Sequence, residues 1–261
     1  MANIKPETIK KIKTTQKIWV SKLTGKLAGI QGISSSCLCN SFCIAMHKLP
    51  DTICWNCYAV QGLSFKAGAR YHYARNTELL SEDLLTPEQI AELKIKADIF
   101  RFETHGDWVN LNSALNEIAI ARAYPHTEFS VWTKRTDLLR QLGKMGVKQP
   151  KNLHVKVSSP LRDKVLDQSV KQELSAIGWE VTYFTVVSLD YLTRNYTMEQ
   201  LQLHGDEIIT CGGRNCRGCM RCYGNHPYAD LLELLKQDVR KAKKLGIKIG
   251  EPQPIEEIPM F

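Results

Sequence analysis

The sequence contains no long hydrophobic run and no apolar segment near its first residue. No stretch approaches the roughly 18 consecutive apolar residues that a membrane-spanning helix needs. Residues 1–6, Met-Ala-Asn-Ile-Lys-Pro, lack the apolar core of a secretion signal. We therefore expect a cytoplasmic protein with no membrane association.

A linker is also lacking. The 261 residues contain no long Pro-, Gly- or Ser-rich stretch that would divide the chain in two. This length suffices to bury the core of one α/β domain. We expect a single domain over residues 1–261.

Cysteine, in contrast, is plentiful. There are nine cysteines, an odd number, and several lie three residues apart. Because disulfides are rare in a reducing cytoplasm, this pattern favours metal ligation. The densest group, residues 211–223, contains Cys211, Cys216, Cys219 and Cys222, with glycines that let the backbone turn closely. Four local thiolates predict a closed iron–sulfur cluster that is structural or transfers electrons, and a zinc site is the alternative.

The other five cysteines lie within residues 37–57. They are Cys37, Cys39, Cys43, Cys54 and Cys57. One metal site takes at most four of them, so at least one is not a ligand. We expect Cys43, Cys54 and Cys57 to hold an iron–sulfur cluster, and Cys37 and Cys39 to be structural or free. Zinc or unliganded thiols are the alternatives, and His47 and His226 are reserve ligands.

Apolar strand-like stretches alternate with helical patterns along most of the chain. The expected strands are 17–23, 99–103, 128–132, 153–157, 180–187 and 207–210. The expected helices are 64–80, one starting at Thr86, 111–124, 137–145, 166–177 and 228–244. Residues 24–36 are expected to be a loop, and residues 250–261 an acidic tail. The alternation predicts an α/β fold with a parallel sheet, a partial or complete (β/α) barrel over residues 17–210. The two cysteine groups are metal-binding insertions, and residues 224–261 follow them as a C-terminal helix and tail.

Polar residues directly follow several expected strands. They are His105, Asp107, Thr133, Lys134, Arg135, Ser158 and Ser159. Because ligands gather at the carboxyl ends of parallel strands, we expect these residues to face one mouth with the first cysteine group.

The basic and hydroxyl residues of this set suit an anionic ligand. Lys134 and Arg135 can bind a carboxylate or phosphate, Arg135 through a bidentate fork, although plain solvent exposure is an equal alternative. Ser158 and Ser159 can donate hydrogen bonds to the same ligand. No histidine or aspartate flanks these serines, so a hydrolytic triad has no support.

The formal net charge is +8, with basic runs at residues 5–17 and 240–248. Lysine-rich helical faces are often simply solvated, whereas the summed positive field also suits a polyanion such as nucleic acid. The charge alone does not choose between these two interpretations.

With these motifs laid out, the chain resembles the "gene product eighty-eight" family of iron–sulfur-type proteins from phages and bacterial genomes. The resemblance rests on several motifs that occur in one order over most of the chain. They lie at residues 40–43, 53–58, 101–107, 132–135, 151–152, 158–160 and 211–223. The resemblance implies cluster binding and a barrel related to that of radical S-adenosylmethionine enzymes, in the host cytoplasm if a phage encodes the chain. It implies no known reaction or substrate.

The first cysteine group departs from the radical enzymes. Their cluster loop has three cysteines within eight residues, whereas here Cys39 and Cys43 begin that spacing and Met46 stands where the third thiol belongs. Cys54 and Cys57 can complete a three-thiolate site. One iron of a four-iron cluster would then be open to a cofactor or substrate.

Two functions follow as hypotheses. In the first, the protein is a radical S-adenosylmethionine-like or redox enzyme. Its catalytic residues would be His105, Asp107, Lys134 and Arg135, and its cofactor-binding residues Gly106, Ser158 and Ser159. Gly106 belongs to the turn that resembles the one holding the cofactor's amino group, and a host reductase would supply electrons. In the second, a non-catalytic iron–sulfur or zinc protein binds nucleic acid or a host protein.

Overall fold

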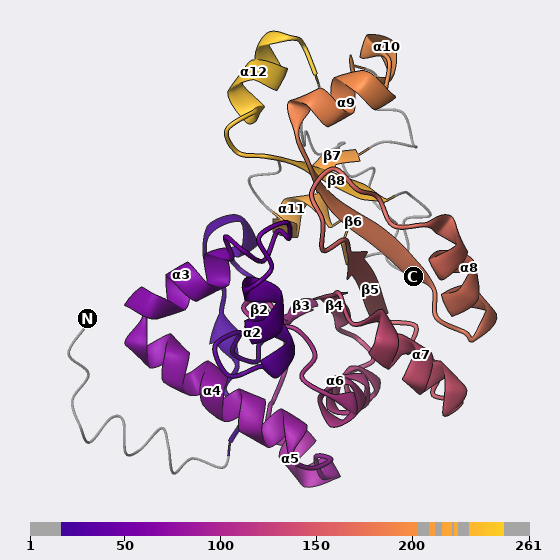
Figure 1. Cartoon of the computed structure of the whole chain (residues 1–261). Helices are drawn as coiled ribbons and strands as arrows, with labels where there is room; N and C mark the ends of the chain where they lie inside the picture. Colours follow the sequence, from indigo (N-terminus) through magenta and orange to yellow (C-terminus); the bar gives the residue numbers. More distant parts are fainter. Residues whose placement is uncertain (1–16, 203–208, 212–215, 221, 224–229, 248–261) are drawn as a thin grey trace.

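Eight strands form one hydrogen-bonded sheet, in the order β1-β2-β3-β4-β5-β6-β8-β7 (Figure 1). The computed structural model describes residues 17–202, 209–211, 216–220, 222–223 and 230–247. The strands are β1 (Ser21–Lys22), β2 (Gln31–Ile33), β3 (Ile99–Phe102), β4 (Glu128–Thr133), β5 (Leu153–Ser158), β6 (Val181–Val187), β7 (Ile209–Cys211) and β8 (Leu231–Leu234). β1 pairs antiparallel with β2, and the other seven strands run parallel to one another.

The predicted α/β fold with parallel strands is therefore confirmed. Closure into a barrel is not shown, because β1 and β7 stand at opposite edges of the sheet formed by the described residues. β8 lies between β6 and β7, so the strand order departs from the chain order only at this end. The single domain over residues 1–261 stays a prediction.

The helices of the crossovers pack side by side. They are α2 (Ser41–His47), α3 (Tyr58–Phe65), α4 (Ala67–Ser81), α5 (Pro87–Ala91), α6 (Leu111–Ala123), α7 (Thr136–Lys144), α8 (Gln168–Ala176), α9 (Leu189–Asn195), α10 (Met198–Gln202), α11 (Cys216–Cys219) and α12 (Val239–Lys244). α3 contacts α4, α4 and α5 contact α6, and α6, α7 and α8 follow one another along the sheet (Figure 1). No described helix combines the length and apolarity that a bilayer span requires.

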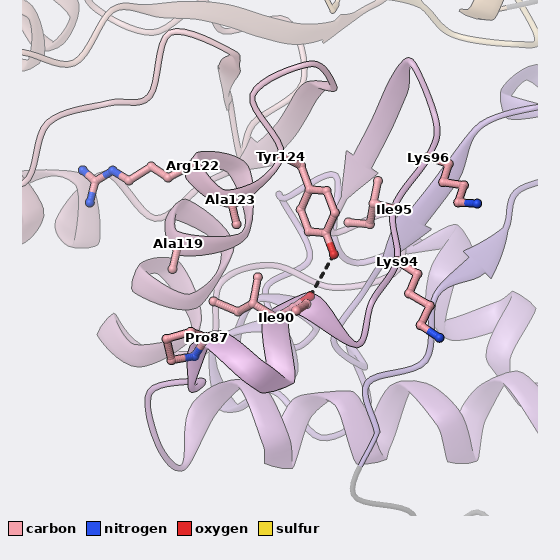
Figure 2. A pocket seen from close by; sticks show the side chains of 10 residues that line it. Pro87, Ile90, Lys94, Ile95, Lys96, Ala119, Arg122, Ala123 and Tyr124 are labelled. Atoms are coloured by element: carbon pink, nitrogen blue, oxygen red, sulfur yellow. Dashed lines mark hydrogen bonds between the residues drawn. The ribbon is translucent and has the colours of Figure 1, made fainter.

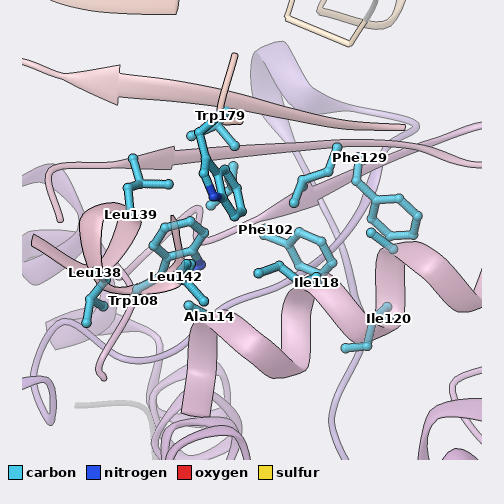
Figure 3. Close-up of a cluster of buried hydrophobic side chains, with 14 of the residues drawn as sticks. Phe102, Trp108, Ala114, Ile118, Ile120, Phe129, Leu138, Leu139, Leu142 and Trp179 are labelled. Atoms are coloured by element: carbon cyan, nitrogen blue, oxygen red, sulfur yellow. The ribbon is translucent and has the colours of Figure 1, made fainter. Parts of the chain in front are cut away.

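The main core lies between these helices and one face of the sheet. Phe102 and Phe129 point from β3 and β4 toward α6, where Phe102 lies next to Ile118, and Leu139 of α7 lies beside Trp179 (Figure 3). The alternate residues of the strands supply this face, because side chains along a strand point to opposite sides. Each large apolar side chain buried there stabilises the fold by about 1.5–3 kcal/mol.

The other face of the sheet is partly polar. Its middle carries Arg101, Ser130, Trp132, Lys156 and Thr182, which alternate with the core residues along β3 to β6. We call these five residues the polar face. Part of this side of the sheet is covered by the second cysteine segment, which packs on Leu23, Ile30 and Ile99.

The predicted start of a helix at Thr86 is confirmed by a capping box. The Thr86 side chain accepts from the Gln89 amide at 3.3 Å, and the Gln89 side chain accepts from the Thr86 amide at 2.9 Å. Pro87 then occupies the first turn, where its missing N–H costs no hydrogen bond.

The predicted terminal helix over residues 228–244 is wrong. Residues 228–229 lie outside the described part, Leu231–Leu234 form β8, and a helix is found only at Val239–Lys244. A short leucine-rich run fits a buried strand as well as a helix, and periodicity alone does not separate them. Residues Leu231–Leu234 form a strand because they pair with β6 and β7.

The N-terminal region also differs from expectation. The expected strand 17–23 shrinks to β1, and β2 forms inside the expected loop. The glycine at position 32 favours a loop in the sequence pattern, so the strand was not predicted. The structure requires glycine there, because an added Cβ would lie 2.5 Å from the Arg101 carbonyl oxygen. The expected helix 64–80 is two helices, α3 and α4, that meet at Lys66, and α2 was not predicted.

Candidate functional site

The first cysteine group lies at the carboxyl ends of β2 to β5, as predicted. Asn40 begins α2, and its side-chain oxygen accepts from the Phe42 amide at 3.0 Å and the Cys43 amide at 3.4 Å. Its amide nitrogen donates to the Asp107 carbonyl at 2.7 Å. This residue therefore fixes Cys43 against the loop that follows β3.

A second connection joins the Cys54 segment to the loop after β5. The Ile53 amide donates to the Pro160 carbonyl at 2.8 Å, and an isolated bridge pairs Thr52 with Leu161. The Ser159 hydroxyl donates within this loop to the Leu161 carbonyl at 3.0 Å. The predicted proximity of Ser159 and the cysteines is thus real, and this serine shapes the loop on which the Cys54 segment lies.

Lys134 lies among the three predicted ligand cysteines. Burial lowers the pKa of its ammonium group, but the negative charges of Cys54, Asp107, Cys43 and Cys57 outweigh burial and raise the pKa. Burial, in turn, raises the pKa of the Cys43 and Cys54 thiols. The half-buried Lys134 is therefore a positive charge close to three cysteines from two chain segments.

Cys37 pairs with Cys57, a contact that the sequence did not reveal. A hydrogen bond from the Cys37 thiol lowers the pKa of Cys57 to about 5, and the Val60 and Ala59 amides at the start of α3 and Lys134 lower it further. The pKa of Cys37 is raised by the same hydrogen bond and by burial. Cys57 is consequently a thiolate at neutral pH, whereas Cys37 is a thiol.

The donor set can be compared with the metals proposed for it. Across the described residues, no three His, Cys, Asp or Glu side chains converge closely enough to hold one metal ion. Zinc requires such convergence, because its four ligands lie at about 2.3 Å for sulfur.

Asp107 is a buried hydrogen-bonding centre of the mouth. Its carboxylate accepts from the Thr133 hydroxyl at 2.6 Å and from the Trp108 and Lys134 amides, each at 2.9 Å. Its carbonyl accepts from the Ser35 hydroxyl at 3.0 Å. The residue therefore joins the ends of β2, β3 and β4, and its catalytic role stays a prediction.

The neutral side chain of His105 is surrounded by aromatic and hydroxyl groups. Burial and nearby Lys66 lower the pKa of its imidazole to about 4. Nδ1 lies 2.9 Å from the Thr104 hydroxyl, and the ring stacks on Tyr73 at 5.0 Å between centroids. The uncharged ring packs under the first cysteine group, where the His105 carbonyl accepts from the Cys37 amide at 3.0 Å.

Arg135 is engaged by the protein itself. Its Nη1 donates to the Trp108 and Val109 carbonyls, each at 2.9 Å, and Nη2 donates to Asp137 at 2.7 Å. The guanidinium group thus holds the start of α7 to the loop after β3. The pair of N–H donors that was expected to bind a ligand donates to the Asp137 carboxylate instead. Ligand binding by Arg135 and by Ser158, which is buried at the end of β5, stays a prediction.

A buried pair of carboxyl groups lies beneath the mouth, and sequence reasoning missed it. Glu103 accepts from the Ser35 hydroxyl at 2.7 Å, and Glu117 accepts from Trp108 Nε1 at 2.7 Å. Burial raises the pKa of both carboxyl groups. The charge of Asp107 also raises the pKa of Glu103, to about 8, and the charge of Glu103 raises that of Glu117. The signal was present in the sequence, since Glu117 sits on the apolar face of its helix, between Ala114 and Ile118.

Gly106 is packed too tightly for any side chain. An added Cβ would lie 2.3 Å from the Ser35 hydroxyl and 2.6 Å from the Glu103 carboxylate. Gly106→Ala is therefore expected to lower the free energy of unfolding by about 1–3 kcal/mol, the usual cost of overpacking. Denaturant unfolding measures the change, with Gly62→Ala as the control because a Cβ there meets no atom within 4 Å. Equal stability of the two variants would contradict the tight packing.

The second cysteine group is described only in part. The side chains of Cys211 and Cys219 lie outside the described part of the structure, as do residues 212–215. Cys216 and Cys222 pack against Tyr223 and Ile99, and Cys222 also contacts Trp132. The group therefore borders the polar face, while the expected tail at residues 250–261 lies outside the described residues.

A hollow of about 760 Å³ lies at the opposite end of the strands (Figure 2). In its wall the Tyr124 hydroxyl donates to the Ile90 carbonyl at 2.9 Å. The lining includes Lys94, Lys96 and Arg122 but no cysteine, histidine or carboxylate. It lacks the groups that the predicted chemistry needs, so the mouth is the better candidate site.

Comparison with known proteins gives one match. A family model described as Gene product 88 matches residues 2–225. No curated protein and no solved structure matches the chain.

Proposed function

This chain belongs to the Gene product 88 family, and we propose that Cys43, Cys54 and Cys57 hold an iron–sulfur cluster at the mouth of an enzyme. The observation that carries the proposal is the position of Lys134 among three thiols from two segments. A cluster held by three thiolates leaves one iron free of protein ligands. When bound, it would supply one electron to a cofactor such as S-adenosylmethionine or directly to a substrate.

The surrounding residues have defined tasks in this proposal. Lys134 offsets the negative charge of the thiolates, and Asp107 holds the Lys134 backbone in place through a 2.9 Å hydrogen bond. Cys37 donates a hydrogen bond to the Cys57 thiolate, which lowers the electron density on that sulfur. Neutral His105 adds no second positive charge beside Lys134 at physiological pH.

The second cysteine group is proposed to hold a closed cluster through Cys211, Cys216, Cys219 and Cys222. β7 ends at Cys211, and α11 begins at Cys216 and ends at Cys219, so three of the four cysteines lie at the ends of secondary-structure elements. All positions of a cluster would be filled by protein, which suits a structural role or electron relay from a host reductase. A relation to radical S-adenosylmethionine enzymes is part of the same proposal, and the sequential order of β2 to β6 is compatible with it.

An exposed apolar surface favours the alternative function, a non-catalytic protein that binds a host protein. Trp55 and Tyr58, which adjoin Cys54 and Cys57 in the chain, are 47% and 67% exposed, and Ile44, Leu49 and Phe65 of the neighbouring segments are exposed as well. Exposed apolar side chains that gather on a surface mark interaction sites. The basic helix α12, in contrast, buries Ala242 and exposes Lys241, Lys243 and Lys244, which is the pattern of a solvated helical face. It therefore does not favour the hypothesis of nucleic-acid binding.

Anaerobic reconstitution with iron and sulfide tests the enzyme proposal. We expect iron uptake at two sites and a spectral change on addition of S-adenosylmethionine or, for a redox enzyme without it, reversible reduction of the open site. Tight zinc binding with no iron uptake would refute the proposal and favour the binding protein.

The Cys57→Ala variant assigns the sites. It is expected to lose about half of the iron, because the first site loses a ligand while the second stays loaded. Cys39→Ala is the matched control, since Cys39 is exposed and outside the proposed ligand set. Iron analysis and absorption spectra on anaerobically purified protein give the readout. Loss of all iron from Cys57→Ala would mean that the two groups ligate one cluster.

A further inference from the structure

Two buried basic side chains on the polar face form no ion pair with an acidic side chain in the described part of the chain. Arg101 and Lys156 are 5% and 4% exposed. Arg101 donates from Nε to the Phe102 carbonyl at 3.0 Å, and no hydrogen bond or ion pair joins Lys156 to any described residue. The carboxylate of nearby Asp230 pairs with Lys171 at 2.9 Å instead. Unpaired buried charges are costly, so a function must account for them.

Unsatisfied polar atoms surround these two cations. The hydroxyls of Ser130, Thr182 and Tyr223 and the indole nitrogen of Trp132 are buried and have no hydrogen-bond partner among the described residues. Native proteins leave few such atoms unpaired, and a cluster of four calls for an explanation. All four are able to donate a hydrogen bond.

The strand register places these groups side by side. Arg101 is opposite Ser130, Trp132 is opposite Lys156, and Lys156 is opposite Thr182. Opposite residues on neighbouring strands point to the same face and are about 4.8 Å apart. The two cationic side chains and the three donors Ser130, Trp132 and Thr182 therefore lie in two adjacent cross-strand rows on one face of the sheet.

An aromatic stack holds the arginine in position. The guanidinium carbon of Arg101 lies 3.8 Å from the Trp132 ring centroid, and the Trp132 and Phe184 rings stack at 4.6 Å. Stacking fixes the plane of the guanidinium group without using its N–H donors. The guanidinium group also interacts with the Tyr223 hydroxyl, and its remaining N–H donors are left for a ligand.

We propose that the polar face binds a small oxyanion, a ligand whose carboxylate or phosphate group lies between Arg101 and Lys156. Ser130, Thr182 and Trp132 donate hydrogen bonds to the remaining oxygens. The two cations are too enclosed for a polymer, so the ligand is a small molecule. The site borders the second cysteine group, because Cys222 contacts Trp132 and its charge acts on Lys156. The first cysteine group lies elsewhere, at the carboxyl ends of the strands.

The test compares Lys156→Met with the wild-type chain, using inorganic phosphate and succinate as probes at constant ionic strength. Wild type is expected to bind at least one probe in calorimetric titration, and Lys156→Met at least about tenfold more weakly, the loss of one charge-assisted hydrogen bond. Without probe, Lys156→Met is expected to melt at a higher temperature, because the unpaired ammonium group is gone. Lys151→Met, an exposed control in the loop before β5, is expected to change neither quantity.

The outcomes separate the sources of the oxyanion. Binding of phosphate alone identifies a phosphate ligand, and binding of succinate alone identifies a carboxylate. The proposal would be overturned if neither probe bound to wild type, or if Lys156→Met bound the probe as tightly as wild type does. If Lys156→Met does not fold, Ser130→Ala serves, with an expected several-fold weakening in a folded chain. Unchanged anion binding by Cys57→Ala separates this site from the first cluster, and unchanged binding by Cys216→Ala separates it from the second.

Discussion

Asp107→Ala is expected to lower the free energy of unfolding by about 3–5 kcal/mol. The substitution leaves three buried donors without an acceptor, the Thr133 hydroxyl and the Trp108 and Lys134 amides. It also removes a negative charge beside the Lys134 ammonium group. Losing one member of a buried charged network typically costs this much. Urea unfolding monitored by tryptophan fluorescence measures the change.

Asp137→Ala is the matched control for this prediction. Asp137 also accepts hydrogen bonds, from Arg135, but its side chain is 53% exposed. Solvent screens an ion pair of this kind, so the expected loss is about 1 kcal/mol or less. If Asp107→Ala were as stable as Asp137→Ala, Asp107 would not join the three strand ends, and its carboxylate would be free for a ligand instead.

Glu117→Gln is expected to stabilise the protein at pH 8 and to have little effect at pH 5. The pKa of Glu103 in the folded chain is about 8 and that of Glu117 is also raised, whereas an ordinary glutamate titrates near 4.5. Burial is the main cause for both, with added repulsion from Asp107 at Glu103 and from Glu103 at Glu117. A raised pKa means that the folded state binds the proton more tightly. Stability is therefore complete below about pH 4.5 and is lost as the pH rises through 8. Glutamine imitates the protonated form and can still accept from Trp108 Nε1.

Thermal unfolding of both proteins between pH 5 and pH 8.5 checks this result. The stability difference at the upper end is expected to exceed about 1 kcal/mol, the value of one pKa unit. Glu82→Gln, at an exposed position on the edge of α4, is the control and should follow the wild-type profile. Parallel pH profiles for Glu117→Gln and wild type would show that the two carboxyl groups do not share a proton.

Much of the central fold follows from local pattern. The strands and helices from residue 99 to residue 187 occur within a few residues of expectation, because alternating and 3.6-residue apolar periods are both strong there. The mouth was predictable for the same reason, since parallel strands bring their carboxyl ends together. Residues 31–33 and 231–234 were not predictable as strands, because a three-residue Gly-containing segment and a leucine run depend on neighbouring strands for their conformation.

The roles of individual side chains were less accessible. Asp107 and Arg135 stand where ligand-binding residues are expected, yet their hydrogen bonds go to the protein itself. Arg101 occurs in a family motif, but its burial without a carboxylate partner depends on strands that are distant in sequence. Asn152, in another motif, donates to the Ala121, Tyr124 and Thr127 carbonyls, which explains that motif by structure alone.

The sequence by itself determined the α/β class, the order of the central elements and the gathering of polar residues and cysteines after the strands, because these depend on short-range periodicity and strand direction. Only the tertiary structure decided that Cys37 touches Cys57, that Glu103 and Glu117 share one buried space, and that Arg101 and Lys156 lie on one face. Such contacts join residues on different strands and helices. Their energies depend on burial and distance, which no local pattern encodes.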